Sequence, residues 1–523
     1  MERLAPSPWA LTARIRTASA EDSRGRADAQ IAWLRDYAGR RVNSLLIDER
    51  RCIPPYIALD FGNAGLFGLL IEEEYGGQAL RFADIARVLE QLAAIDVGLG
   101  TWHLTSVFPG TRALSAWGTP ELKAGWLTGL ASGRLLGAYG QTEPETGSDF
   151  TRITTRARPA PHGWTLSGHK YWVGNGSWAS VATILCRLVD EQDAPARLVA
   201  FAVPLDVPGV RFGEEHLSLG LRGMVQSGLT FDTVALDRSL LLGEGEGIQV
   251  AVDSMAMTRF ALAAAALGAT RRVLQLALRF STRRTLAGRR LCERTVTREA
   301  LGEMCAYTAI GESLVYGLAE QLDQGRPVAL ESVTAAKVMT SEWLGQAADR
   351  LLQLLGGRGY DEANPAARLY RDVRVYRIFE GATEALLDFL GTRALTQPER
   401  IAALIADEQV AARLAEALAA GPATDHDRQR ALAGPALAWA FAVAAVRARP
   451  PSGPHAAAVA EARFAQALRD VRSGGGPRTV AVMPPEELTS TVAAYSDRIG
   501  DLEQSLPGER TVLDPLLGVV PRA

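Results

Sequence analysis

The chain has 523 residues, 47% of them hydrophobic, and a formal net charge of -3 at pH 7. This composition is typical of a globular protein with a large core, and the length predicts roughly two to four domains. The near-neutral charge excludes the basic surface on which nucleic-acid binding depends, so we expect no nucleic-acid partner. Four widely spaced cysteines and six scattered histidines favour neither a disulfide framework nor a metal site. The cysteine pattern suits a reducing compartment, and we expect a cytoplasmic protein.

The N-terminal residues 1–28 mix arginines with Glu21 and Asp22 and contain no continuous apolar core. They predict an N-terminal arm rather than a signal peptide. No apolar run reaches the roughly 18–20 residues of a membrane span, and the most apolar helical stretch, residues 432–446, is shorter. We therefore expect no transmembrane segment.

The pattern of apolar residues changes along the chain. Residues 29–132 have helical periodicity, and residues 133–246 have short apolar runs between Gly, Pro and Asp turns, which predicts a small antiparallel sheet or barrel. Regular alternation of strand and helix is missing, which argues against a Rossmann domain. Residues 247–397 are again helical. Residues 398–523 are Ala-rich with two or three helical stretches, and they form either an appended helical domain or a mobile extension.

Two motifs in the predicted β region suit a flat cofactor. Residues 139–149 read YGQTEPETGSD, in which Gly147 allows close backbone approach to a ring or phosphate, and Thr142 and Ser148 supply hydroxyls. Residues 168–175 read GHKYWVGN, in which Trp172 offers an apolar stacking face.

The helical region after residue 247 carries the other candidate residues. Arg259 and Arg284 are guanidinium groups that bind phosphate or carboxylate through paired hydrogen bonds. The sequence Gln353-Leu-Leu-Gly356-Gly357 combines an amide with glycines that allow backbone contact. A predicted helix over residues 366–379 ends at Gly381, so the carboxylate of Glu380 is placed at a chain reversal rather than on a solvated helix face.

The order of these motifs resembles the acyl-CoA dehydrogenase family over roughly residues 29–395. The resemblance rests on TEPETGSD at 142–149, GHKYWVGN at 168–175, GGRGY at 356–360, LYRD at 369–372 and FEG at 379–381. It implies a mainly α fold with a central β domain: an N-terminal helical domain, a β-sheet or barrel domain, a four-helix bundle and a C-terminal helical extension. FAD would lie between the β domain and the bundle.

The resemblance also implies the reaction and the role of each residue. Glu380 would remove the α-proton of a saturated acyl thioester while a hydride leaves the β-carbon for flavin N5, giving the 2,3-enoyl thioester. Substrate would contact Ser148, Arg259 and Gly381. The implied FAD contacts are Tyr139, Thr142, Gly147, Ser148, Trp172, Gly174, Arg284, Gln353, Gly356, Gly357 and Ala382. The family further implies an electron acceptor such as an electron-transfer flavoprotein, and a homodimer or homotetramer in which Arg284 reaches the FAD of a neighbouring subunit.

Three positions depart from the family pattern and keep alternatives open. Gly174 and Ala382 lack hydroxyls that the family usually has beside the flavin, and Ala256 replaces an Asp that contacts the pantetheine arm. The substrate is therefore either an acyl-CoA or an acyl-carrier protein. The alternative activities are an acyl-CoA oxidase or flavin monooxygenase on the same fold, or a degenerate family member without catalysis.

Overall fold

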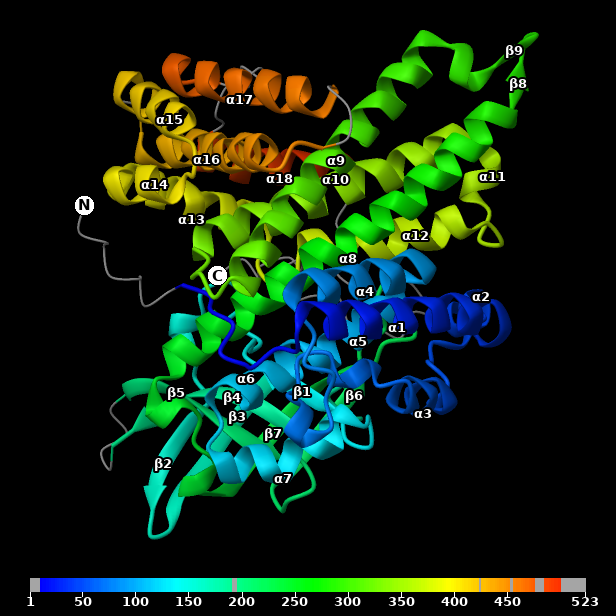
Figure 1. Ribbon diagram of the computed structural model, residues 1–523. Helices are drawn as coiled ribbons and strands as arrows, with labels where there is room; N and C mark the ends of the chain where they lie inside the picture. The colour runs from blue at the N-terminus through cyan, green and yellow to red at the C-terminus, as the bar shows by residue number, and fades with distance from the viewer. Residues whose placement is uncertain (1–9, 191–194, 423–424, 452–454, 476–483, 500–523) are drawn as a thin grey trace. The chain divides into compact units, whose positions relative to one another are not determined.

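The computed structural model describes residues 10–190, 195–422, 425–451, 455–475 and 484–499 (Figure 1). The chain divides into two compact units, Met1–Gly474 and Gly475–Ala523. The second unit contributes one described element, helix α18, Pro485–Ile499. The first unit holds every residue that the sequence assigned to a site.

Helices make up the N-terminal part of the first unit. Several are capped by polar side chains: Ser19, Asn43 and Thr119 each accept a hydrogen bond from a backbone N–H of the first turn. The helices are α1 Ala20–Arg41, α2 Ser44–Arg50, α3 Pro55–Asn63, α4 Phe82–Ile95, α5 Val97–Val107, α6 Pro109–Trp117 and α7 Pro120–Ala131.

The predicted β region forms one seven-stranded sheet with the order β1-β4-β2-β3-β7-β6, and β5 pairs with β4. Its strands are β1 Gly137–Gly140, β2 Arg156–Ala160, β3 Gly163–Gly174, β4 Val181–Val189, β5 Pro195–Pro204, β6 Val210–Glu215 and β7 Gln226–Asp237. The sheet is not wholly antiparallel as predicted, because β1 and β2 both run parallel to β4. Neither is joined to β4 by a tight turn, so the connection does not impose an antiparallel pairing.

The third part is a helical bundle built around one long helix. Residues 256–270 of this helix, α8, are buried on every side, as expected where neighbouring helices surround an apolar segment. Its neighbours include α4, α9 and α10. The elements are α8 Gly247–Arg283, β8 Thr285–Leu286, β9 Arg289–Arg290, α9 Thr295–Asp323, α10 Leu330–Leu355, α11 Gly357–Tyr360, α12 Pro365–Val373 and α13 Thr383–Thr396.

The start of the C-terminal extension packs on this bundle. Trp439 lies against Trp343 of α10, with ring centroids 5.8 Å apart, and Trp343 stacks on Tyr307 of α9 at 4.9 Å. The extension therefore shares an aromatic cluster with the bundle, and it belongs to the first unit as far as Gly474. Its helices in this unit are α14 Pro398–Leu404, α15 Glu408–Ala420, α16 His426–Ala448 and α17 His455–Ser473.

Two helices are long and apolar enough to cross a membrane, judged by length and composition alone. They are α8, with 37 residues, and α16, with 23, so α16 is longer than the stretch 432–446 on which the expectation rested. The sequence reading of α16 stopped short because it counted only the uninterrupted apolar run. The apolar window of α8 is completely buried and that of α16 is 61% buried, as is usual for core helices.

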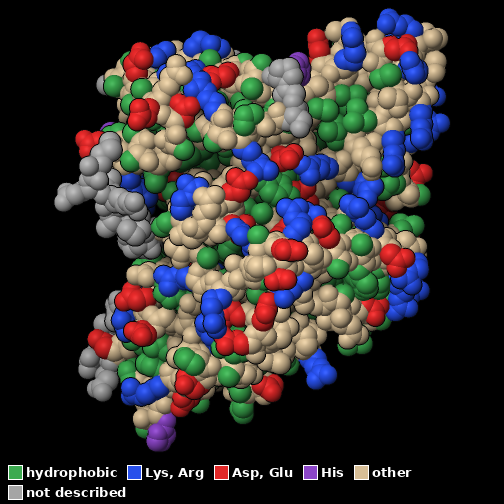
Figure 2. Space-filling model, in the orientation of Figure 1, with side chains coloured by type: hydrophobic (Ala, Val, Ile, Leu, Met, Phe, Trp, Pro, Cys, Tyr) green, Lys and Arg blue, Asp and Glu red, His purple; other side chains and the backbone are tan. Residues whose placement is uncertain are grey.

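On the face shown in Figure 2, basic and acidic side chains are interspersed.

Candidate active site

Glu380 lies in a tight reversal between two helices. Helix α12 ends at Val373, earlier than the predicted residue 379, and a 3-10 turn, Arg374–Arg377, leads to Glu380. The backbone φ of Glu380 is +55°, a left-handed conformation that non-glycine residues seldom adopt. Gly381 follows with φ +102°. This strained turn removes the carboxylate from the helical surface and leaves it half-buried.

Two buried cations hold the backbone of this turn. Arg259 of α8 donates from Nε to the Glu380 carbonyl at 3.0 Å, and Lys337 of α10 donates from Nζ to the Gly381 carbonyl at 2.8 Å. The Arg259 side chain is fixed in turn by Thr334, whose hydroxyl lies 3.2 Å from Nη1. The consecutive carbonyls of Glu380 and Gly381 are thus held by side chains from two different helices of the bundle.

The electrostatics of the turn follow from burial and these two charges. Burial raises the pKa of the Glu380 carboxyl above its usual value, and Arg259 and Lys337 oppose the rise. Burial, together with Arg259, lowers the pKa of Lys337 to about 7. The pKa of the Tyr139 hydroxyl is raised by burial and by the charge of Glu380, which places Tyr139 of β1 within electrostatic reach of the carboxylate. An acid with a raised pKa is suited to proton abstraction near neutral pH.

A buried ion pair shapes the 142–149 turn. Lys170 Nζ lies 2.8 Å from Glu143 Oε1, and both side chains are almost fully buried. Glu143 also accepts hydrogen bonds from Thr154 and Thr155. Burial alone would raise the pKa of Glu143, but Lys170 and these hydrogen bonds lower it to about 2. The Thr142 carbonyl accepts from the Tyr171 N–H at 2.8 Å, which ties the turn to β3.

The turn presents backbone and hydroxyl groups to the outside. Gly147 and Ser148 are both exposed, and a Cβ added at Gly147 would meet no atom within 4 Å. Asp149 supports the following 3-10 turn by accepting from the Thr151 N–H at 3.1 Å. The open side of Gly147 is the kind of surface onto which a ring or phosphate can approach closely.

Trp172 stands at an irregular position of β3. Its φ is +55°, its side chain is 51% exposed, and the β3–β7 register shifts between Lys170 and Val173. The indole ring lies 4.2 Å from the His216 ring, at an angle of 34°. Two residues on, a Cβ at Gly174 would come within 2.6 Å of Thr105 Cγ2. The strand therefore exposes a large aromatic face beside a position that has room only for glycine.

The remaining predicted FAD contacts lie at the far end of the bundle. Arg284 ends α8 where the β8–β9 hairpin begins, and Gln353 lies in the last turn of α10 before α11; in Figure 1 the hairpin and α11 are well separated from the β strands. Arg284, Gln353, Gly356 and Gly357 are all exposed. Added Cβ atoms at Gly356 and Gly357 would meet nothing within 4 Å. Ala382 is separate from this group, because it is the residue before α13 and next to the Glu380 turn.

The two groups of residues suit the two ends of a dinucleotide cofactor. The β-domain group offers an exposed indole face, hydroxyls and accessible backbone, which fit a flat ring system. The far group offers a guanidinium, an amide and open glycine backbone, which fit a pyrophosphate or adenine. The residues present therefore fit FAD, provided that the two groups serve one cofactor from different copies of the chain.

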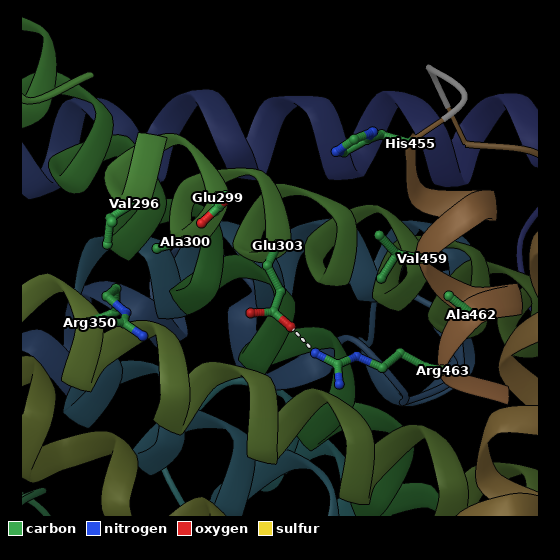
Figure 3. A pocket seen from close by; sticks show the side chains of 9 residues that line it. All are labelled: Val296, Glu299, Ala300, Glu303, Arg350, His455, Val459, Ala462 and Arg463. Carbon is green, nitrogen blue, oxygen red and sulfur yellow. Dashed lines mark hydrogen bonds and ion pairs between the residues drawn. The ribbon is translucent and has the colours of Figure 1, made fainter. Parts of the chain in front are cut away.

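A hollow of the described surface lies elsewhere. It has a volume of about 520 Å³ and lies between α9, α10 and α17, where Glu303 pairs with Arg463 (Figure 3). None of the residues that line it was predicted as a site residue. We assign no part of the chemistry to it.

Sequence reasoning missed the residues that support the site. Lys337, Glu143 and Lys170 were not predicted, nor was the contact of Thr105 with the strand that carries Trp172. The usable signal was a lone lysine within an apolar helical segment, Ala335-Ala336-Lys337-Val338-Met339. A single charged residue among buried apolar residues is expected to have a hydrogen-bond or ion-pair partner.

Comparison with known proteins identifies three family models along the chain. They are described as the N-terminal domain of acyl-CoA dehydrogenase for residues 29–134, the middle domain for 138–234, and the C-terminal domain for 245–395. The very long-chain specific acyl-CoA dehydrogenase of Mus musculus is 31% identical over 333 residues, which are 62% of this chain. The matched region spans 51% of the mouse protein, so the comparison extends over about half of that relative.

Solved structures extend the comparison to the fold. A glutaryl-CoA dehydrogenase from Mycobacterium smegmatis in complex with FADH2 is 28% identical, with a TM-score of 0.65 over 72% of this chain and 95% of that one. An acyl-CoA dehydrogenase from Bacillus anthracis complexed with FAD has a TM-score of 0.72 over 95% of both chains, at 21% identity. The latter match shares the fold through most of the C-terminal extension.

Proposed function

Because the chain belongs to the acyl-CoA dehydrogenase family, whose members use FAD, we propose that it dehydrogenates a saturated acyl-CoA to the 2,3-enoyl-CoA, with Glu380 as the base. The observation that carries the proposal is the Glu380 turn. Its carboxylate is partly buried, its pKa is raised by burial, and two cations bind the consecutive carbonyls of Glu380 and Gly381. FAD, when bound, supplies the acceptor for the hydride.

The residues of the chain have two tasks in this reaction. Glu380 takes the α-proton, which is too weakly acidic for an ordinary carboxylate in water. The thioester oxygen must therefore be bound by hydrogen-bond donors that stabilise the developing negative charge. Among the described residues, no acceptor is bonded to the Glu380 N–H, so this amide is available as one such donor.

The first test is the substitution Glu380→Gln in the FAD-loaded protein. We expect the anaerobic bleaching of bound flavin by a panel of acyl-CoA thioesters to slow by about 10²–10⁴-fold, the usual contribution of a general base. Glu384→Gln is the matched control, because Glu384 is exposed in the first turn of α13. Bleaching of the Glu380→Gln protein at the wild-type rate would disprove the assignment.

Acyl-carrier protein as substrate, and oxidase activity, form the second candidate function. Oxidase activity is favoured because the positions of two usual hydroxyls are apolar: Gly174 is covered by methyl groups of Thr105 and Met224, and residue 382 is Ala. A carrier-protein substrate is favoured by Ala256, which stands where the family often has an Asp that contacts the pantetheine arm. Oxygen uptake during turnover identifies an oxidase, and comparing one acyl group on CoA and on a carrier protein identifies the carrier.

The partners follow from the same proposal. We infer a homodimer or homotetramer, because the predicted FAD contacts lie at two separated regions of one chain (Figure 1). The cytoplasmic location that we propose rests on the four widely spaced cysteines. An electron-transfer flavoprotein is the type of acceptor that the family uses. We propose that it reoxidises the flavin here.

A further inference from the structure

Lys337 is a buried lysine that the reaction described above does not use. Its side chain is inaccessible to solvent, and its Nζ is bonded to a backbone carbonyl rather than to a carboxylate of the described residues. Its one hydrogen bond in this part of the chain goes from Nζ to the Gly381 carbonyl, 2.8 Å away and 44 residues along the sequence. Burying an ammonium group without a carboxylate partner is unfavourable, so a compensating role is expected.

The charged side chains around Lys337 include the carboxylate of the Glu380 turn. Arg259, on α8, raises the local positive potential, and Glu380 and Glu342 lower it. Glu342, on α10 itself, is already bound by the guanidinium of Arg377 and the hydroxyl of Thr383. Glu380 has no such ion pair among the described residues, so it is the acid whose charge Lys337 is placed to balance.

The backbone geometry supports the same role. Glu380 keeps a left-handed conformation that a free chain would seldom adopt, and the carbonyls of Glu380 and Gly381 are held separately. Arg259 fixes the first carbonyl and Lys337 the second. Losing either contact would leave one of the two peptide planes of the turn unrestrained.

We propose that Lys337 is a positioning residue for the Glu380 base: its ammonium group fixes the turn through the Gly381 carbonyl and supplies positive charge to the carboxylate. The inference rests on the proposed role of Glu380. Other groups that face the carboxylate are Arg259 on α8 and Tyr139 on β1. Neither contacts the Gly381 carbonyl among the described residues.

The test measures the protonation of Glu380 directly, without substrate. The carboxyl band of Glu380 is isolated by subtracting the infrared spectrum of the Glu380→Gln protein from that of the FAD-loaded protein, and it is followed as a function of pH. In Lys337→Gln, which keeps a hydrogen-bond donor but loses the charge, we expect the midpoint to rise by about one pH unit or more. Lys337→Arg keeps the charge and should stay near the wild-type midpoint.

Two further variants separate charge from packing. Lys337→Met fills similar space with no charge and no donor, and should raise the midpoint at least as far as Lys337→Gln. Lys123→Met, on α7, removes one lysine charge outside the site and should leave it unchanged. The pH profile of flavin bleaching should move with the infrared midpoint in each variant.

The outcomes distinguish this inference from the proposed function. An unchanged Glu380 midpoint in Lys337→Gln overturns the role of Lys337, even if acyl-CoA bleaches the flavin normally. If Lys337→Met is too unstable to purify, the comparison of Lys337→Gln with Lys337→Arg decides the question. If no thioester bleaches the wild-type flavin, the proposed function fails while the infrared result still reports the coupling of the two side chains.

Discussion

Gly174 shows how neighbouring side chains fix the identity of one residue beside the site. A Cβ there would lie 2.6 Å from Thr105 Cγ2 and 2.8 Å from Met224 Cε. We expect Gly174→Thr, which restores the usual family hydroxyl, to lower the free energy of unfolding by about 1–3 kcal/mol through overpacking. Urea unfolding of the FAD-loaded protein measures the change.

The control for this prediction is the double variant with Thr105→Ala. Removing Cγ2 opens space for the new side chain, so the double variant should lose less stability than the two single variants together. Strict additivity would show that the Thr105 methyl does not exclude a larger residue at 174.

The residues proposed to contact reactants were more predictable than those that support them. Glu380, Trp172 and Gly147 stand in local motifs whose residues are neighbours in the sequence. Lys337 acts on a carbonyl 44 residues away, and Lys170 acts on a carboxylate 27 residues away. No local pattern predicts such pairs, because the fold brings them together.

At the scale of elements, a buried arginine connects α6, α8 and the segment before α1. Arg112 binds both carboxylate oxygens of Asp253, at 2.8 and 2.9 Å. It also donates to the carbonyls of Thr12 and Ala13, at 2.8 and 2.7 Å. The N-terminal arm that the sequence predicted over residues 1–28 is therefore attached here, and α1 begins within its range at Ala20.

We expect Asp253→Asn to lower the free energy of unfolding by about 3–5 kcal/mol, because it leaves the Arg112 charge buried without compensation. The measurement is urea unfolding, with proteolysis near residues 10–19 as a second readout of detachment. Asp232→Asn is the control, because Asp232 is paired with Arg211 at the surface and should change stability by less than about 1 kcal/mol. Equal losses in both variants would contradict the argument.

The type of each element was easier to predict than its ends and its partners. Periodicity located the long helices and the strand region, since apolar spacing is a local property. The parallel pairing of β1 and β2 with β4 was not predictable, because it depends on strands that are distant in sequence. Similarly, α12 gives way to a 3-10 turn at Arg374, and this change prepares the reversal at Glu380.

At the scale of the whole molecule, the fold class was predictable and the packing of the extension was not. The sequence left open whether residues 398–523 form an appended domain or a mobile extension. Helices α14–α17 belong to the first compact unit, and Trp439 joins the aromatic cluster of the bundle. This contact involves residues nearly 100 positions apart, and Ala-rich helices carry no pattern that specifies such a partner.

The predicted FAD contacts lie in two separated regions of one chain, so we expect two chains to share each cofactor. If one cofactor is held by the β domain of one chain and by Arg284 of another, two different defects can complement each other. Glu380→Gln removes the base, and Arg284→Ala removes a cofactor contact at the far end of the bundle. In a mixed dimer, one of the two sites combines the intact Glu380 of one chain with the intact Arg284 of the other.

We therefore expect each variant alone to bleach its flavin slowly, and a co-expressed mixture to recover about a quarter of the wild-type sites when chains associate at random in dimers. Amplitudes of the fast bleaching phase measure this recovery, and light scattering establishes that the protein is oligomeric. A chain carrying both substitutions, co-expressed with Glu380→Gln, is the control, because no pairing of these chains contains an intact Glu380. Recovery no greater than in this control would show that each FAD site is built within one chain. Only a shared site lets the intact Arg284 of one chain serve the intact Glu380 of the other.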